Sequence, residues 1–504
     1  MNFLKRLLFY RVVLIGFALF IQLAVLIGVI IRFNDYFVFF YWANIIISIL
    51  VVFWIINNNI NPDYKIAWII LILVFPIFGG LFYIFFGRGN TSWRKMQNII
   101  VRSIAALQPT PMILAELALK NETAANQSKY LQSYAYSPVY KNTSTEYLPI
   151  GEITFERLQE ELKKAERYIF LEYFIIEEGV MWNSILEILV EKAGQGLDVR
   201  VIYDDVGCLL TLPHRYDKYL EKLGIKCCVF NRLIPVLSLG HNNRDHRKIA
   251  VIDGHIGFTG GINLADEYIN AYEKYGHWKD SAIMLRGEAV WSFTIMFLTM
   301  WGYLRGVEED FNQFKPKPLL TTPKEAGGYV QPFADNPLDH EPVGEIVYLN
   351  MINKARKYVY ICTPYLIVDS QILTALTSAA KGGVDVRIIT PYIGDKRFVQ
   401  AVSRSYYKNL INNGVKIYEY LPGFMHSKTY ISDDCYGIVG TINMDYRSLY
   451  MHFECGVWLY NNSIMQIKED FLTTLEMCKP ADPENIRWYE LWAGSILRIF
   501  APLM

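Results

Sequence analysis

Two short segments of the chain carry the same chemically reactive side chains at the same spacing. The first runs from His246 to Asp253 and the second from His426 to Asp433, and both read His-x-Lys-x4-Asp. Each is followed at matched offsets by two glycines and an Ile-Asn pair, which ends at Asn263 in the first copy and Asn443 in the second. Agreement at so many positions indicates an internal duplication.

The duplicated side chains suit the transfer of a phosphoryl-type group. An imidazole can act as a nucleophile or as a general acid near neutral pH. Ammonium and amide groups can hold the non-bridging oxygens of a phosphate. Two copies therefore supply what a covalent transfer needs, one histidine to attack and one to protonate the leaving oxygen. The alternative, in which each histidine is a buried structural residue at a strand end, explains a single copy better than a matched pair.

The other motif residues divide into two expected roles. We expect the phosphate site to be lined by Lys248, Lys428, Asn263 and Asn443. The two aspartates that close the motifs, Asp253 and Asp433, are expected to be structural and charge-balancing.

A nucleophilic imidazole also needs an acceptor that orients its other ring nitrogen. In the second half the candidate is Glu454, 28 residues after His426. The first half has no acid at that offset, and Asp280 is its nearest substitute, with a solvated surface acid as the alternative. Glu172 is an acid inside a strand-like run, where it lies either in the catalytic cleft or in a buried ion pair.

Strand and helix patterns alternate around each motif. In the first half, residues 151–165 and 182–193 predict helices, and residues 168–176 and 196–203 predict buried strands. The same order returns at residues 355–361, 372–380 and 383–389. Such alternation is typical of parallel sheets covered by helices. The sequence therefore predicts an α/β fold of two duplicated halves whose pseudo-twofold symmetry brings both motifs to one cleft.

Composition narrows the class of substrate. The 49 basic and 49 acidic residues balance, which argues against a nucleic-acid partner. The seven cysteines form no disulfide framework or metal-site spacing, so neither a metal nor another cofactor is expected.

Three apolar stretches at the N-terminus, residues 12–31, 36–56 and 66–86, are each long enough to span a bilayer. Basic residues flank the group on both sides, and the positive-inside rule then requires an even number of crossings. We interpret the second and third stretches as a membrane hairpin, with the first at the interface or re-entrant. The turn at residues 57–62 would then face outside.

These patterns divide the chain into five parts. Residues 1–105 form a membrane anchor, 106–310 the first half, 311–345 a proline-rich linker, 346–480 the second half and 481–504 an amphipathic tail. The tail is expected either to lie in the membrane interface or to dock on the protein's own core. An apolar loop at residues 231–240 has two interpretations, folding back onto the core or contacting the membrane and acyl chains.

The duplicated motif resembles the signature of the phospholipase D superfamily. Within it the chain is most similar to the bacterial cardiolipin synthases, over nearly its whole length. The resemblance includes Thr363-Pro-Tyr365, Asp445-Tyr-Arg-Ser448 and Phe453-Glu454, as well as the membrane hairpin and the apolar tail. The chain departs from that family in its additional first apolar stretch, which bears on topology.

The resemblance implies a two-step exchange between two phosphatidylglycerol molecules. His246 would be the nucleophile and His426 the acid and base, giving cardiolipin and glycerol without a metal. It also implies a multi-pass protein of the bacterial cell membrane, with its catalytic part in the cytoplasm. Self-association is left open. The alternatives are a phospholipase D or a phosphatidyltransferase with another acceptor, and a catalytically inactive membrane scaffold.

Overall fold

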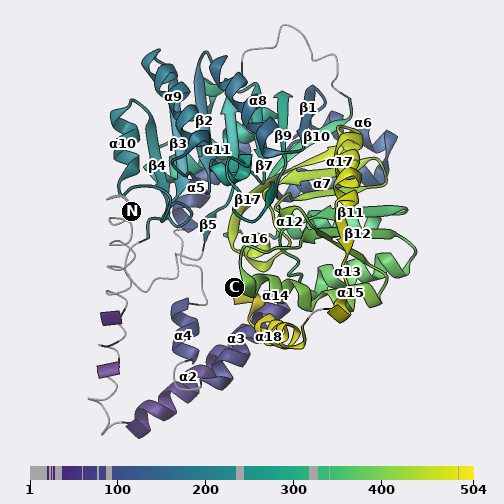
Figure 1. Ribbon diagram of the computed structural model, residues 1–504. Helices are drawn as coiled ribbons and strands as arrows, with labels where there is room; N and C mark the ends of the chain where they lie inside the picture. Colours follow the sequence, from purple (N-terminus) through teal and green to yellow (C-terminus); the bar gives the residue numbers. More distant parts are fainter. Residues whose placement is uncertain are drawn as a thin grey trace.

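The computed structural model describes residues 37–58, 61–75, 79–86, 93–233, 243–316, 327–339, 341–485 and 487–503, with residues 20, 21, 24, 27 and 28. Two sheets face each other in these ranges, and helices cover them (Figure 1). Most of the expected stretch at residues 12–31 and most of the apolar loop at 231–240 lie outside the described residues.

The first half contains a seven-stranded sheet in the order β1-β9-β7-β6-β2-β3-β4. The strand that follows the first motif histidine, β6, is buried along its whole length because its Ile-Ala-Val-Ile run has no polar face. The bounds in sheet order are Thr143–Leu148, Ala282–Gly287, Ile256–Gly260, Lys248–Ile252, Tyr168–Tyr173, Asp198–Asp204 and Lys226–Phe230.

The second half repeats this order with an added edge strand, as β10-β17-β16-β15-β11-β12-β13-β18. The matching orders confirm the predicted duplication. The bounds in sheet order are Tyr329–Asp335, His452–Tyr460, Tyr436–Gly440, Thr429–Ser432, Tyr358–Cys362, Asp385–Pro391, Lys416–Tyr420 and Cys478–Pro480.

The sheets are mixed, whereas the sequence predicted parallel ones. Within each half, the three strands joined by crossover helices run parallel, as β2, β3 and β4 do. The strand that carries each motif, β6 or β15, is antiparallel to both of its neighbours. The reason is that a short turn, which contains Asp253 or Asp433, joins each motif strand to the next strand, and a short turn produces antiparallel pairing.

Two short strand pairs cross between the halves. The first-half strand β5 (Arg244–Asp245) pairs with β17, and the second-half strand β14 (Gly423–Met425) pairs with the first-half strand β8 (His277–Lys279). Each crossing strand comes directly before a motif histidine. The peptide N–H of His246 therefore donates to Phe453 O at 2.9 Å, and that of His426 donates to Lys279 O at 2.7 Å.

Helices fill both the faces and the space between the sheets. The helix α11 packs between the two sheets, where Phe297 stacks on Phe170 with ring centroids 4.6 Å apart. Around the sheets lie α5 (Trp93–Ala106), α6 (Pro111–Lys120), α7 (Glu122–Tyr134), α8 (Gly151–Lys163), α9 (Val180–Gly194), α10 (Tyr216–Lys222), α11 (Val290–Arg305), α12 (Val343–Lys354), α13 (Ser370–Lys381), α14 (Arg397–Ser405), α15 (Tyr407–Asn412), α16 (Tyr446–Tyr450) and α17 (Ile464–Glu476).

Two segments pack elsewhere than the expected divisions suggest. The helices α6 and α7 fall within the expected first half, residues 106–310, yet their buried side chains Leu117 and Leu131 belong to the core of the second half. The segment expected as a linker contains β10, which pairs with β17 along seven residues. Both segments come from the chain between regular repeats, where the repeat pattern offers no guide to packing.

The described residues of the second and third N-terminal stretches lie in the helices α2 (Phe37–Asn57), α3 (Pro62–Val74) and α4 (Gly79–Phe86). Within the described residues, no helix combines the length and the apolar character that crossing a bilayer requires. The third predicted stretch is two helices, because Pro76 cannot continue α3: a proline lacks the peptide N–H and disfavours helix in the residue before it.

The turn before α3 was expected on the far side of a membrane from the catalytic part, and this was wrong. Asn61 donates to Asp369 Oδ2 at 3.0 Å and to the Tyr450 hydroxyl at 2.7 Å. Asp63 accepts from the Tyr446 hydroxyl at 2.8 Å. The turn is therefore bound to the second half, through side chains that the hydrophobicity pattern does not report.

The C-terminal tail contains α18 (Trp488–Ile499), which docks against α14. Gly494 allows the close approach, because a Cβ there would lie 2.3 Å from Ala401 O. Arg498 covers the Tyr406 ring at 3.9 Å. Trp488 and Trp492 remain exposed on the outer face, so docking on the core and an apolar outer surface occur together.

Candidate active site

The two motif histidines lie in one buried site between the halves, as their reciprocal backbone contacts require. His246 is 8% exposed and His426 is 6% exposed. The two lysines that follow them are buried almost completely, and each ammonium group donates to the carbonyl of its own motif histidine. Four cationic or potentially cationic side chains therefore occupy one desolvated space.

The carboxylates that orient the histidines cross between the halves. Glu454 accepts from His246 Nδ1 with its two oxygens at 2.9 and 3.0 Å. Asp280 lies 2.5 Å from His426 Nδ1. Matching offsets within each half predicted the opposite partners, and that pairing was wrong. The reason is that β17 and β8 each run alongside the other half's motif, through the cross-half strand pairs.

The two asparagines of the repeat occupy unlike environments. Asn263 accepts from the Ile175 N–H at 3.0 Å and donates to the Tyr268 hydroxyl at 2.6 Å, so its amide is held by the protein. The Asn443 side-chain oxygen is buried without a hydrogen-bond partner among the described residues. Of the two amides, Asn443 is therefore the freer to contact a ligand.

The two motif aspartates lie away from the histidines, at the far ends of β6 and β15. Asp253 accepts three peptide N–H bonds, from Glu166, Arg167 and Tyr168, at 2.7–3.0 Å. Asp433 accepts the equivalent three from residues 356–358 at 2.7–3.0 Å. Both aspartates have φ near +55° and so close the turn that follows each motif strand.

Glu172 lies in a buried ion pair outside the group of catalytic side chains. Its carboxylate is 2.5 Å from Arg247, which also binds Asp245 through Nε at 3.0 Å. Burial raises the pKa of Glu172 well above its ordinary value. The pair fixes Arg247, the residue between the two catalytic-type side chains of the first motif.

Comparison with known proteins finds the same domain once in each half of the chain. A family model for the cardiolipin synthase, phospholipase D-like domain matches residues 158–284 and 348–475, and a phospholipase D-nuclease N-terminal model matches residues 46–88. A cardiolipin synthase of Geobacillus thermodenitrificans is 36% identical, covering 90% of this chain and 92% of its own. The chain belongs to the cardiolipin synthase family.

Two further relatives extend this result. An uncharacterized protein of Streptococcus mutans is 45% identical, covering 90% of this chain and 99% of its own. Phosphatidylserine synthase from Haemophilus influenzae shares the fold, with a TM-score of 0.57 and 14% identity over 75% of this chain and 97% of its own. Membership of the cardiolipin synthase family makes this chain an enzyme that transfers phosphatidyl groups.

Burial sets the charge state of this synthase site. It lowers the pKa of His246 well below the ordinary value and that of His426 to about 4, with the neighbouring lysines acting in the same direction. Burial also lowers the pKa of Lys248 to about 8 and that of Lys428 to about 7. A buried cationic site of this kind gains stability when an anion enters, and the anion raises the pKa of each group.

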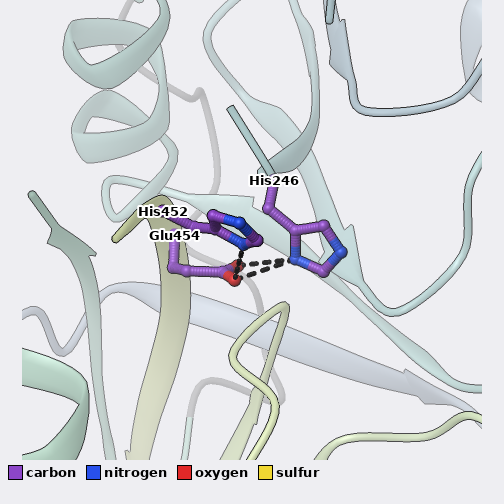
Figure 2. A group of neighbouring side chains, drawn as sticks. All are labelled: His246, His452 and Glu454. Carbon is purple, nitrogen blue, oxygen red and sulfur yellow. Dashed lines mark hydrogen bonds and ion pairs between the residues drawn. The ribbon is translucent and has the colours of Figure 1, made fainter. Parts of the chain in front are cut away.

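A third histidine, which the sequence analysis did not identify, lies beside the first. The rings of His452 and His246 are 5.6 Å apart, and His452 Nδ1 is 3.8 Å from Glu454 Oε1 (Figure 2). Burial lowers the pKa of His452 to about 4. The only signal in the sequence is that His452 lies two residues before Glu454. Side chains two positions apart on a strand such as β17 point to the same face of the sheet.

The same three side chains could hold a divalent cation. Ligand atoms of His246, His452 and Glu454 lie within 4.8 Å of one another. An ion bound to Nδ1 of His246 would replace the proton that this atom shares with Glu454, because the metal takes the lone pair to which the proton is attached. The expectation that the reaction uses no metal stays a prediction.

Proposed function

We propose that this enzyme makes cardiolipin from two molecules of phosphatidylglycerol and releases glycerol. The observation that carries the proposal is the crossed pair of carboxylate–histidine contacts, Glu454 with His246 and Asp280 with His426, around two buried lysines. Each carboxylate accepts the Nδ1 proton and leaves the Nε2 lone pair free to react. Two such imidazoles in one site serve an attacking and a proton-transferring role.

In the first step, Nε2 of His246 forms a bond to the phosphorus of the donor lipid. The bond from phosphorus to the glycerol oxygen breaks, and His426, which is protonated on Nε2 once the anionic lipid has raised its pKa, gives that oxygen its proton. Lys248 and Lys428 stabilise the charge that develops on the phosphate oxygens, and burial strengthens their effect. The products are a phosphatidyl-histidine and free glycerol.

In the second step, the hydroxyl of a second phosphatidylglycerol attacks the same phosphorus. His426, now neutral, takes the hydroxyl proton, the phosphorus–nitrogen bond breaks, and His246 recovers its lone pair. The direction of proton transfer reverses between the steps, so one residue serves both. Asn443 lies in the loop after β16, and its buried side-chain oxygen, which has no hydrogen-bond partner among the described residues, would accept a hydrogen bond from a hydroxyl of the lipid.

We also propose that the N-terminal helices hold the enzyme at the bacterial cell membrane, with the catalytic halves on the cytoplasmic side. Exposed apolar side chains on α2, among them Trp42, Ile46 and Phe53, support this, as do Trp488 and Trp492 on α18. Retention in the membrane fraction after alkaline carbonate washing tests it. Release of the full chain by carbonate would refute anchoring.

The test of the reaction is incubation of the purified protein with phosphatidylglycerol in mixed micelles containing a chelator. Equal amounts of cardiolipin and free glycerol are expected. Phosphatidic acid with glycerol would mean that water is the acceptor and that the protein is a phospholipase D. Unchanged cardiolipin output from both His246→Ala and His426→Ala would remove the two histidines from the mechanism.

A further inference from the structure

Arg447, which is partly buried, differs from the buried arginines of the first half because it has no carboxylate within ion-pair distance among the described residues. Arg200, Arg244 and Arg247 each lie within 3.2 Å of an aspartate or glutamate oxygen. The nearest acid in sequence, Asp445, instead caps α16 by accepting the peptide N–H groups of residues 447 and 448. The buried Nε atom of Arg447 makes no hydrogen bond within the described residues.

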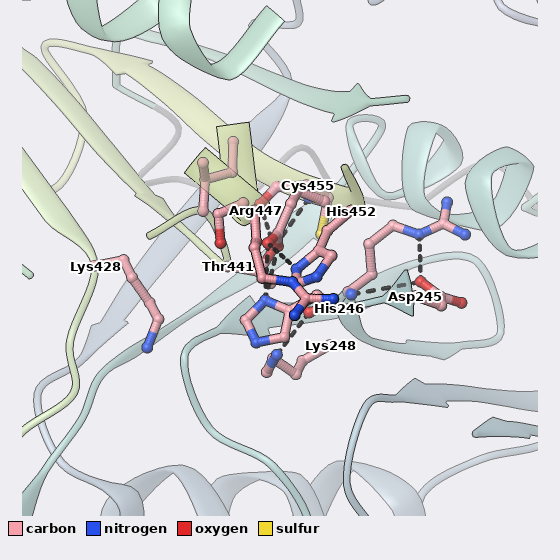
Figure 3. A network of polar contacts seen from close by, with 12 residues as sticks. Asp245, His246, Lys248, Lys428, Thr441, Arg447, His452 and Cys455 are labelled. Atoms are coloured by element: carbon pink, nitrogen blue, oxygen red, sulfur yellow. Dashed lines mark hydrogen bonds and ion pairs between the residues drawn. The ribbon is translucent and has the colours of Figure 1, made fainter. Parts of the chain in front are cut away.

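This unpaired guanidinium lies in the active site. Figure 3 shows Arg447 reaching from α16 into the group of side chains that includes His246 and His452. Its charge is close enough to oppose protonation of His452. Neither ring nitrogen of His452 makes a hydrogen bond among the described residues. Among the described residues, the Arg447 Nε and both ring nitrogens of His452 therefore have no acceptor within hydrogen-bond distance, which is costly for buried atoms unless a ligand supplies one.

The first half lacks this arrangement at the matched positions. Four residues after Asn263, where the second half has Arg447, the chain has Glu267, which is paired to Lys274 at 2.7 Å. Two residues before Asp280, where the second half has His452, it has Trp278. The surroundings of His426 are accordingly aromatic, with Trp278 at 5.3 Å and Phe424 at 5.6 Å between ring centroids.

In the proposed reaction, the two catalytic motifs share one phosphate site. The pair of Arg447 and His452 occurs in the second half only, with no counterpart at the matched positions among the described residues of the first half. A single phosphate held symmetrically needs no such pair. The proposed reaction, however, brings two phosphodiesters together, and in its product they are joined by one glycerol bridge. The second phosphate must therefore lie close to the catalytic histidines without occupying their site.

We propose that Arg447, together with His452, binds the phosphate of the acceptor lipid. The proposal rests on the proposed function and deepens it by assigning the second substrate a subsite of its own. A guanidinium suits this task because its planar N–H groups bind two phosphate oxygens at once and stay charged when buried. An imidazole beside it donates a further hydrogen bond to the same anion.

The subsite explains how a buried transferase prefers a lipid acceptor to smaller alcohols. Glycerol and water offer a hydroxyl but no phosphate, so neither gains from Arg447. Phosphatidylglycerol offers both, and the binding energy of its phosphate holds its hydroxyl near the phosphorus. Selection among acceptors follows from one charged contact that lies away from the reacting atoms.

The experiment compares two acceptors for the same enzyme intermediate. Purified enzyme in phosphatidylglycerol micelles receives radiolabelled glycerol, and two rates are read together, cardiolipin formation and incorporation of label into phosphatidylglycerol. In the exchange, the labelled glycerol oxygen bonds to phosphorus as the phosphorus–nitrogen bond breaks. The variants are Arg447→Gln, Arg447→Lys and His452→Gln, and Arg356→Gln removes an exposed positive charge as the matched control.

Arg447→Gln should lower the ratio of cardiolipin formation to glycerol exchange by about tenfold or more, the usual effect of losing a charge-assisted contact. Arg447→Lys should recover part of the ratio, His452→Gln should lower it less, and Arg356→Gln should match the wild type. Equal falls in both rates would place Arg447 at the donor phosphate or in the fold and overturn the subsite. An unchanged ratio would overturn it as well.

The wild-type arm separates the two proposals. If the wild-type enzyme exchanges glycerol but makes no cardiolipin, the proposed function itself has failed, and the acceptor subsite fails with it. If the wild type makes cardiolipin and only the ratio in Arg447→Gln fails to fall, the function stands and the subsite alone is refuted.

Discussion

Glu454, in the second half of the chain, accepts a bidentate contact from Nδ1 of His246 in the first half, at 2.9 and 3.0 Å. The Thr441 hydroxyl donates to the same carboxylate at 2.5 Å and fixes its rotamer. Asp280 of the first half binds His426 of the second half in the same way. Neither half therefore supplies the carboxylate that orients its own histidine, and each depends on the other for it.

Replacing that carboxylate tests its positioning role. Glu454→Gln should lower kcat by about 10³- to 10⁴-fold, the size of effect seen when an orienting carboxylate is neutralised. The acidic limb of the pH profile should move to lower pH, since the carboxylate no longer favours protonated His246. Rates measured across pH check both. A loss of equal size at every pH, with the limb in place, would mean that Glu454 serves only the fold; Glu484→Gln, on the surface, is the control.

Trapping the intermediate decides which histidine attacks. A phosphatidyl substrate with p-nitrophenol as its leaving group needs no protonation at departure, so the first step proceeds without an acid. His426→Asn should release about one nitrophenol per enzyme and then stop, because no base activates the acceptor. His246→Asn should show no burst. Protein from the first variant, denatured in detergent at mildly alkaline pH where the phosphorus–nitrogen bond survives, should carry the lipid on His246.

The reverse result would exchange the roles. A burst from His246→Asn with lipid on His426 would make His426 the nucleophile. The motif repeat cannot settle this point, because both histidines have the same sequence context and both keep a carboxylate at Nδ1.

How far the sequence predicts this molecule depends on whether an interaction is repeated. The duplicated motifs, the strand order of each half and the helices α8, α9 and α13 follow from periodicity, which both halves show. The crossed carboxylates do not, because an offset within one half carries no information about the strand pairs between halves. Arg447 and His452 were missed for a related reason: they break the repeat, and the repeat was the signal.

The contacts of the N-terminal turn could not be predicted from the sequence either. Hydrophobicity alone predicts apolar stretches, and it correctly marks α2 and α3. It assigns no partner to Asn61 or Asp63, whose contacts with Asp369 and Tyr446 depend on the fold of residues 308 and 383 positions away. Polar side chains at the ends of apolar helices therefore need the structure before their side of the membrane is assigned.

Alkaline pH should weaken substrate binding through Lys428. Burial lowers the pKa of this ammonium group to about 7 and that of Lys248 to about 8, so both lose their protons as pH rises through these values. The free enzyme then presents less positive charge to an anionic lipid. We expect kcat/KM for phosphatidylglycerol to fall above about pH 7 to 8 as the lysines become neutral.

Lys428→Arg separates this cause from others. A guanidinium keeps its charge through this pH range, so the alkaline limb should move to higher pH even if the maximal rate is lower. The limb is measured from kcat/KM at matched ionic strength, because salt also screens lipid charge. An alkaline limb at the same pH in wild type and variant would assign it to another group.

The buried pair of Arg247 and Glu172 should matter for stability. Arg247→Met leaves Glu172 and Asp245 buried without their cation, and breaking a buried pair in this way costs about 3–5 kcal/mol. Because Glu172 already has a raised pKa, it should take up a proton in the variant, and the loss should shrink as pH falls. Urea unfolding of the micelle-bound protein at two pH values measures both effects.

The double variant Glu172→Gln with Arg247→Met supplies the control. It removes one carboxylate together with the cation, so it should unfold at a higher urea concentration than Arg247→Met alone. If both variants unfold at the wild-type midpoint, the pair contributes nothing to stability. A double variant that is less stable than Arg247→Met would show that Glu172 acts through a contact other than Arg247.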